Sequence, residues 1–129
     1  MRHIGVDLHK TNFVVCFLSA DDTSEVETFP LTSHGLERFK RRLRKDDLVA
    51  VEVTQNIYYF YDQIKSCVSR VALVDTYRFA VIAKSKKKTD KADARALARF
   101  LKLGHLPTVP MPSQQVRELR HLLQARERL

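Results

Sequence analysis

The chain has 129 residues, of which 44% are hydrophobic and 29% are charged, and its net charge is +8. This length and composition fit one soluble globular domain and exclude a disordered chain. No apolar run approaches the roughly 18 residues of a membrane span, and charged residues interrupt the start of the chain where a signal peptide would be apolar. Cys16 and Cys67 are too few and too far apart for a zinc motif or a disulfide framework. We therefore expect a cytoplasmic protein with no membrane partner.

The first half of the chain predicts three strands followed by a helix. Apolar residues that alternate or run continuously mark strands at 2–8, 12–19 and 25–31, and the short links between them suit an antiparallel meander. Apolar residues then recur at helical spacing from about residue 33 to residue 45. The outer side of this helix is strongly basic.

The second half predicts alternating strands and helices. The expected order is a strand at 48–53, a helix at 56–68, a strand at 70–74, a short helix at 77–83 and a helix at 90–103. Three prolines predict a linker at 106–113, and a last helix follows with an unfinished apolar stripe. We therefore expect one domain at 1–108. Residues 109–129 would be a linker and the start of an oligomerisation or interdomain helix that leads to a missing region.

This order of elements is the layout of a ribonuclease H-like domain. We expect an α/β fold with a five-stranded mixed sheet flanked by helices, in which the first and fourth strands are parallel neighbours. Asp7 and Glu52 would then lie near the C-terminal ends of adjacent strands, at the edge where open α/β sheets bind ligands. Because a buried carboxylate without a partner is costly, Glu52 in its apolar strand needs an ion pair or a metal ion.

Asp90 and Asp93 begin the helix that follows the lysine run, and they lie on one face about a turn apart. If this helix packs across the sheet edge, four carboxylates converge and repel one another unless cations neutralise them. Hard oxygen ligands suit Mg²⁺ or Mn²⁺, and two such ions about 3.5–4 Å apart support phosphodiester transfer. The alternative is that Asp90 and Asp93 cap the helix, Asp7 caps a turn and Glu52 forms an ordinary salt bridge.

Three segments together resemble a known family. They are I-G-V-D-L-H-K at 4–10, V-E-V-T at 51–54 and K-K-T-D-K-A-D-A-R-A-L-A at 87–98. This pattern resembles the N-terminal domain of the DEDD insertion-sequence transposases, the Piv-like recombinases, whose fold is similar to that of the Holliday-junction resolvase RuvC. The resemblance implies that the residues matching D, E, D and D are both catalytic and metal-binding, namely Asp7, Glu52, Asp90 and Asp93.

The resemblance also implies an activity: metal-dependent phosphodiester cleavage and strand transfer in DNA transposition or site-specific recombination. Two Mg²⁺ or Mn²⁺ ions would be the cofactors. DNA would be the substrate, the full-length protein would be a homo-oligomer, and several family members use a structured guide RNA. The family has a second, C-terminal domain with a serine implicated in strand transfer, so we expect this chain to be the N-terminal catalytic half and inactive in isolation. Gln55 stands where the family usually has glycine.

Basic residues beside the acidic cluster are expected to bind the nucleic-acid backbone without reading sequence. The candidates are Lys84, Lys86, Lys87, Lys88, Lys91, Arg95, Arg41 and Arg42. The alternative is that they only form solvated surface. His9, two residues after Asp7, is a candidate neighbour of the metal ligands.

For the whole chain, the alternative to an enzyme is a catalytically silent nucleic-acid-binding or assembly module. An actin-like or sugar-kinase ATPase is disfavoured, because Leu8-His9-Lys10 stands where these enzymes need a glycine-rich phosphate loop.

Overall fold

The computed structural model describes residues 1–83 and 89–127. The candidate residues Lys84, Lys86, Lys87 and Lys88 lie outside the described residues. In chain order the elements are β1 (His3–Leu8), β2 (Asn12–Leu18), β3 (Ser24–Pro30), α1 (Ser33–Arg42), β4 (Leu48–Glu52), α2 (Ile57–Ile64), β5 (Arg70–Val74), α3 (Thr76–Ala83), α4 (Asp90–Leu103), β6 (Thr108–Val109) and α5 (Gln114–Glu127). Each predicted element is present, although α1 and α2 end a few residues earlier than expected.

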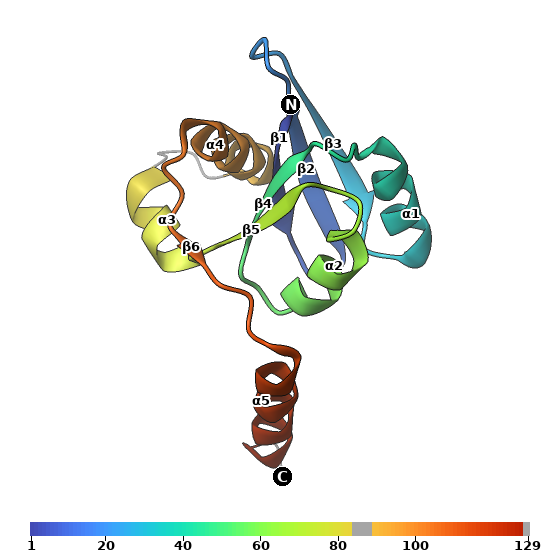
Figure 1. Cartoon of the computed structure of the whole chain (residues 1–129), viewed down its shortest axis with the longest axis vertical. Coiled ribbons are helices and arrows are strands. Elements are labelled where there is room, and N and C mark those ends of the chain that lie inside the picture. The colour runs from blue at the N-terminus through green and yellow to red at the C-terminus, as the bar shows by residue number, and fades with distance from the viewer. Residues whose placement is uncertain (84–88, 128–129) are drawn as a thin grey trace.

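The strands form one mixed sheet in the order β3-β2-β1-β4-β5-β6 (Figure 1). β1 and β3 both pair with β2 in antiparallel fashion, whereas β1, β4 and β5 run parallel to one another. The meander followed by parallel strands confirms the predicted ribonuclease H-like layout, with β1 and β4 side by side near the centre.

A sixth strand, β6, adds to the five that were expected. It lies in the predicted linker and pairs in antiparallel fashion with the end of β5, through Val109 with Leu73 and Thr108 with Val74. Pro107 and Pro110 flank it, and because proline has no N–H to donate, the pairing stops after two residues. The prolines that predicted a linker thus restrict β6 to two residues, but they do not prevent it from forming.

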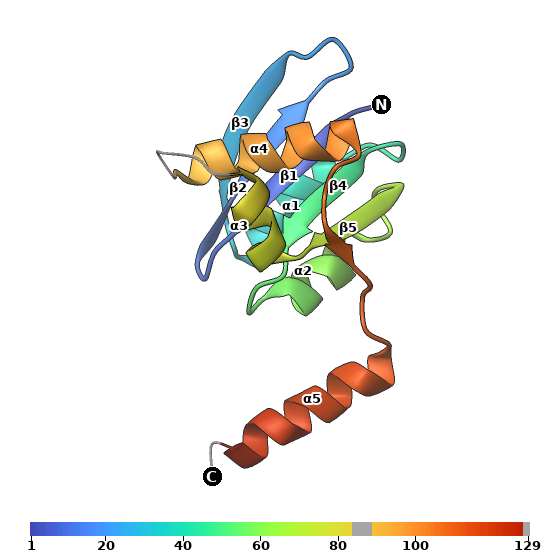
Figure 2. The same cartoon turned by 90° about the vertical axis from the view of Figure 1, so that its left-hand side faces the viewer.

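Helices cover both faces of the sheet (Figures 1 and 2). One face packs against α1 and α2, in a core whose centre is a group of aromatic rings contributed by strands and helices. The ring of Phe13 lies 5.2–5.3 Å from those of Phe29, Phe39 and Phe60. The opposite face packs against α4, with α3 beside it: Phe79 of α3 and Leu97 of α4 belong to one buried cluster.

Small residues allow α4 to lie unusually close to β1. A Cβ atom at Gly5 would collide with the carbonyl oxygen of Ala94 and would lie 2.6 Å from the backbone nitrogen of Ala98. Ala94 and Ala98 are themselves fully buried. Glycine on the strand and alanines on the helix therefore fix the distance between β1 and α4, and with it the place of the first turn of α4.

Both ends of α4 are capped. Thr89 is the N-cap, and its hydroxyl oxygen accepts a hydrogen bond of 3.1 Å from the backbone N–H of Ala92. Gly104 ends the helix with a left-handed φ of 74°, which glycine adopts without strain. The threonine of the K-K-T-D motif thus defines where the helix carrying Asp90 and Asp93 begins.

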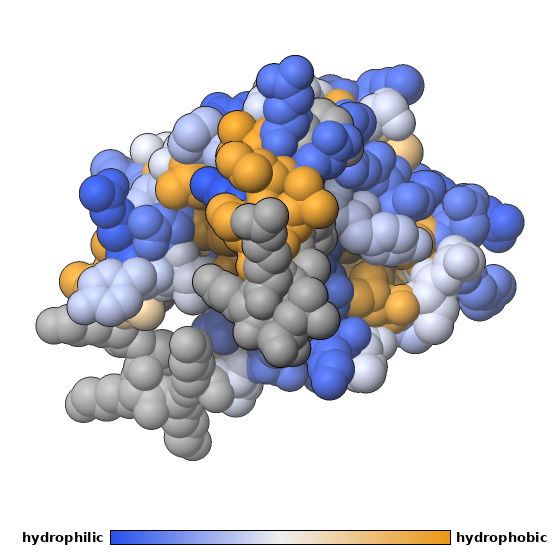
Figure 3. All heavy atoms as spheres, turned by 90° about the horizontal axis from the view of Figure 1, so that it is seen from below, coloured by the Kyte–Doolittle hydropathy of each residue, from blue (hydrophilic) through white to orange (hydrophobic). Residues whose placement is uncertain are grey.

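The last helix, α5, projects away from the sheet and its covering helices (Figures 1 and 2). It is attached at its start, where the guanidinium of Arg117 donates to both carboxylate oxygens of Asp62 at 3.0 Å and Arg120 donates to the Tyr58 hydroxyl at 2.9 Å. Apolar surface gathers on this side of the molecule (Figure 3). The exposed apolar residues of α5 are Val116, Leu119, Leu122 and Leu123. Within residues 1–83 and 89–127, no helix is long and apolar enough to cross a membrane.

Candidate metal centre

Asp7 lies at the end of β1 and is almost completely buried, with its side chain 12% exposed. β1 and β4 are parallel, and Val6 is paired with Val51. Asp7 and Glu52 are the next residues along the two strands, directly after this last pair. They share the face of Gly5, which is the face covered by α4. Glu52 is half-buried. The predicted placement of both acids at one end of adjacent parallel strands is confirmed.

Asp90 and Asp93 occupy the first turn of α4. Because α4 packs across β1, this turn lies over the end of the strand, and the negative charge of each acid raises the pKa of the Asp7 carboxyl. The positive end of the helix dipole favours acids in this turn. Asp90 is exposed and Asp93 half-buried. Since Thr89 is the residue that caps the helix, neither aspartate is needed for capping.

His9 connects Asp7 and Asp90. Its Nε2 atom lies 2.9 Å from an Asp7 carboxylate oxygen and 3.2 Å from an Asp90 carboxylate oxygen. The candidate ligand atoms of Asp7, His9 and Asp90 all lie within 4.8 Å of one another. His9 follows Asp7 by two, which places both side chains on the same side of an extended segment. That spacing is the sequence signal for this contact, and the structure gives His9 a more central place than the sequence reading did.

The pKa of the Asp7 carboxyl is raised above its ordinary value. Burial is the main cause; the charge of His9 and its hydrogen bond oppose the shift, and the charges of Asp93 and Asp90 add to it. A buried acid facing two further acids is unfavourable as an anion unless a cation lies nearby. Carboxylate oxygens with one imidazole nitrogen are donors that fit a divalent metal ion. The residues present therefore suit the metal that the sequence predicts.

The outer side of α4 is basic. Lys91, Arg95 and Arg99 are exposed and follow one another at four-residue spacing, so they form one row that starts beside Asp90. None of the three makes an ion pair with an acid in the described parts of the chain. This row is available to an anionic partner.

The other basic segment, in α1, has a different character. Arg42 pairs with Glu25 at 3.0 Å and with Glu27 at 3.1 Å, and its guanidinium lies 4.4 Å from the centre of the Phe17 ring. Its charge is thus compensated by acids of β3, and these contacts join α1 to the sheet. Arg41, by contrast, is exposed to solvent, and nucleic-acid binding by Arg41 or Arg42 stays a prediction.

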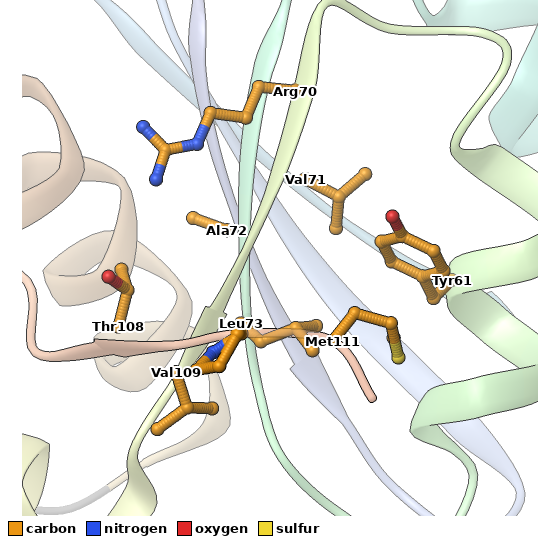
Figure 4. A pocket seen from close by; sticks show the side chains of 9 residues that line it. Tyr61, Arg70, Val71, Ala72, Leu73, Thr108, Val109 and Met111 are labelled. Atoms are coloured by element: carbon orange, nitrogen blue, oxygen red, sulfur yellow. The ribbon is translucent and has the colours of Figure 1, made fainter. Parts of the chain in front are cut away.

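A pocket of about 390 Å³ lies where β5, β6 and α2 meet (Figure 4). Arg70 of β5, Tyr61 of α2 and Met111 after β6 are among its lining residues, and an adjoining pocket of about 330 Å³ includes Tyr58 and Arg120. Neither pocket is lined by any of the four predicted acids. The acidic group at the end of β1 is therefore separate from these two pockets.

The strand order and the acidic group define the class of this protein: a ribonuclease H-like domain with a candidate metal centre at the C-terminal edge of its parallel strands. Residues 4–129 match the transposase family of the DEDD, IS110 type, so the chain belongs to that family, as its motifs predicted.

Among solved structures, the chain is similar to RuvC from Thermus thermophilus, with 13% sequence identity and a TM-score of 0.43. The alignment covers 84% of this chain and 100% of that chain. No curated protein matched the chain in sequence.

Proposed function

We propose that this chain is the nuclease half of a transposase, which cleaves and transfers DNA strands with the help of divalent metal ions. The observation that carries the proposal is the meeting of Asp7 from β1 and Asp90 from α4 around a single histidine nitrogen. Residues so distant in the sequence meet here because Gly5, Ala94 and Ala98 allow close packing. This packing costs the chain a buried acid with a raised pKa, which favours a function for the site over a structural one.

In this proposal, Asp7, Glu52, Asp90 and Asp93 hold the metal. Asp7 and Glu52 are fixed by the sheet, whereas Asp90 and Asp93 are fixed by the capped start of α4. Two Mg²⁺ or Mn²⁺ ions, when bound, would help to activate the attacking oxygen and to stabilise the leaving one. The chain would contribute the four carboxylates, held by the sheet and by the start of α4, with the Asp7 side chain largely buried.

DNA is the proposed substrate, and the exposed row on α4 is its proposed contact. Lys91 and Arg95 begin this row beside the acids, so they would hold backbone phosphates near the bond to be cut. The four lysines at 84, 86, 87 and 88 directly precede α4 and are proposed to join them. Arg41, on the opposite face of the sheet, is proposed to contact more distant DNA or a structured guide RNA.

We also propose the division of the chain into a catalytic domain and a helical extension. Because Val109 pairs with Leu73 in the sheet, we propose a boundary after residue 109, one residue later than the sequence suggested. The exposed apolar residues of α5 are proposed to pack in the homo-oligomer or against the family's second domain.

The experiment compares the wild-type chain with Asp7→Asn and with a matched control, Asp46→Asn, whose carboxylate is 64% exposed beside the N-terminal amine. Mn²⁺ affinity should fall by about tenfold or more in Asp7→Asn and stay unchanged in the control. DNA affinity in EDTA should be kept or increased, because a negative charge is removed. In a longer protein with the second domain, Asp7→Asn should abolish metal-dependent cleavage of a DNA end.

A catalytically silent binding module would behave differently. It would bind DNA equally well with and without divalent metal, and Asp7→Asn would leave its Mn²⁺ affinity at the level of the control. Either result would refute the proposed nuclease function.

A further inference from the structure

His9 stands among the predicted metal ligands, although it is not one of the four acids of the motif. Its backbone N–H donates to the carbonyl oxygen of Asn12 at 2.9 Å, inside the hairpin that joins β1 to β2. The hairpin thus fixes the position from which the ring reaches the two carboxylates. The side chain is 38% exposed, so the group of ligand atoms is open on one side to water or to a substrate phosphate.

One nitrogen of this ring faces two carboxylate oxygens. The contacts of 2.9 Å to Asp7 and 3.2 Å to Asp90 both end on Nε2. This nitrogen carries at most one hydrogen, which can point well at one oxygen but not at both. The imidazole can therefore donate a well-aligned hydrogen bond to only one of the two carboxylates. A metal ion placed between the three atoms would be coordinated by both carboxylate oxygens and by the nitrogen.

The separations also suit ligands of one ion. Adjacent ligands of an octahedral ion with bonds of 2.0–2.1 Å are separated by about 2.8–3.0 Å. The distances from Nε2 to the two oxygens are close to this spacing, and all three atoms fit within 4.8 Å. Small shifts would bring Asp7, His9 and Asp90 onto one ion and leave its other positions free.

A nitrogen ligand changes which metal the site prefers. Carboxylates suit Mg²⁺ and Mn²⁺ alike, but imidazole binds first-row transition metals more strongly than Mg²⁺. The neutral ring can bind a metal through Nε2 when its hydrogen is on Nδ1, so metal binding would select that tautomer. A site with His9 among its ligands would thus favour Mn²⁺ over Mg²⁺ more than a site built from acids alone.

We propose that His9 is a direct ligand of the ion held by Asp7 and Asp90, and that its Nε2 atom shifts the preference of this centre from Mg²⁺ towards Mn²⁺. This inference rests on the proposed function, since it concerns the same metal centre. It adds a fifth ligand from the hairpin after β1 and gives that ligand a role in metal choice.

The test is pulsed electron paramagnetic resonance of the chain loaded with Mn²⁺, together with titrations of Mn²⁺ and Mg²⁺. The variants are His9→Gln, which replaces the nitrogen with a hard amide oxygen, and the control His34→Ala. His34 is exposed on α1, on the opposite face of the sheet. Asp7→Asn serves as the variant without the central carboxylate.

Wild type and His34→Ala should show coupling of Mn²⁺ to an imidazole nitrogen, and His9→Gln should lose it. Mn²⁺ affinity should fall by about tenfold in His9→Gln while Mg²⁺ affinity falls less. A role limited to hydrogen bonding would leave no nitrogen coupling in the wild type.

Three results would overturn the inference. If Mn²⁺ binds through Asp7 without nitrogen coupling, His9 is not a ligand, and the proposed nuclease function stands. If the coupling persists in His9→Gln, the nitrogen belongs to another residue. If the wild type binds no Mn²⁺ even with a DNA duplex present, the inference and the proposed function fail together.

Discussion

Replacing Gly5 with alanine tests whether the contact between β1 and α4 builds the metal centre. The added Cβ would collide with the carbonyl oxygen of Ala94 and approach the nitrogen of Ala98 to 2.6 Å. Both obstacles are backbone atoms, which cannot rotate away, so α4 must shift outward. Overpacking of a core typically costs about 1–3 kcal/mol, and a clash with backbone belongs at the upper end. A loss of about 3 kcal/mol lowers the melting temperature by roughly 10 °C in a chain of this size.

The shift should also weaken metal binding, because it moves Asp90 away from Asp7. We expect Mn²⁺ affinity to fall by about tenfold or more when it is measured below the melting transition. Urea unfolding gives the stability and calorimetric titration gives the affinity.

Gly104→Ala is the matched control. Gly104 has a φ of 74° with no atom near the position of a Cβ, so alanine there costs about 1–2 kcal/mol through backbone strain alone. It lies at the far end of α4 and should leave metal affinity unchanged. If Gly5→Ala kept wild-type stability and affinity, close packing of α4 on β1 would not be what positions the acids.

Three further predictions concern the same region. Because burial raises the pKa of the Asp7 carboxyl above 3.8, the metal-free folded chain holds the proton of this carboxyl more tightly than the unfolded chain does. Urea unfolding in EDTA should therefore show the free energy of unfolding falling as pH rises from 3.8 through the raised pKa. Asp7→Asn should abolish this part of the pH dependence. Metal affinity should change in the opposite direction, rising over the same interval. Thr89→Ala removes the N-cap hydrogen bond and should cost about 1 kcal/mol in urea unfolding, whereas Thr89→Ser should restore most of it. Arg95→Ala should reduce the slope of log DNA affinity against log salt concentration by about one, the value expected for one lost phosphate contact. An unchanged slope would mean that Arg95 does not contact the DNA backbone.

Much of the site could be predicted from the sequence because it follows from strand geometry. Asp7 and Glu52 stand at equivalent positions of parallel neighbours once the order of strands is known, and alternation places them on one face. The start of α4 at Asp90 was likewise predicted, although Thr89 was not recognised as the residue that caps it. These features could be predicted because they depend on residue spacing within single strands and helices and on the strand order of a ribonuclease H-like sheet.

The remainder depended on contacts between distant segments. The ring of His9 meets Asp90 because α4 lies close to β1, and that distance is set by Gly5 and two alanines. The two-residue strand β6 depends on the free edge of β5, which no pattern within a proline-rich segment reveals.

The basic residues show the same difference between local pattern and tertiary contact. Arg42 and Arg95 look alike in a charge count, yet Arg42 is compensated by Glu25 and Glu27 of β3. Arg95 makes no ion pair in the described part of the chain. Because α1 packs against β3, acids on that strand compensate cations on that helix. Net charge therefore overstates the surface open to nucleic acid, and the row on α4 is the part that stays available.

The proposed metal ligands and the proposed DNA contacts lie next to each other on α4. Its first turn carries Asp90 and Asp93, and its exposed row of cations begins within one residue of Asp90. Without metal, the acids repel a phosphate backbone that Lys91 and Arg95 attract, so the two effects oppose each other at this end of the helix. A divalent ion would remove the repulsion and leave the attraction. DNA should therefore bind more tightly in Mn²⁺ than in EDTA, and by thermodynamic reciprocity DNA should strengthen Mn²⁺ binding by the same factor.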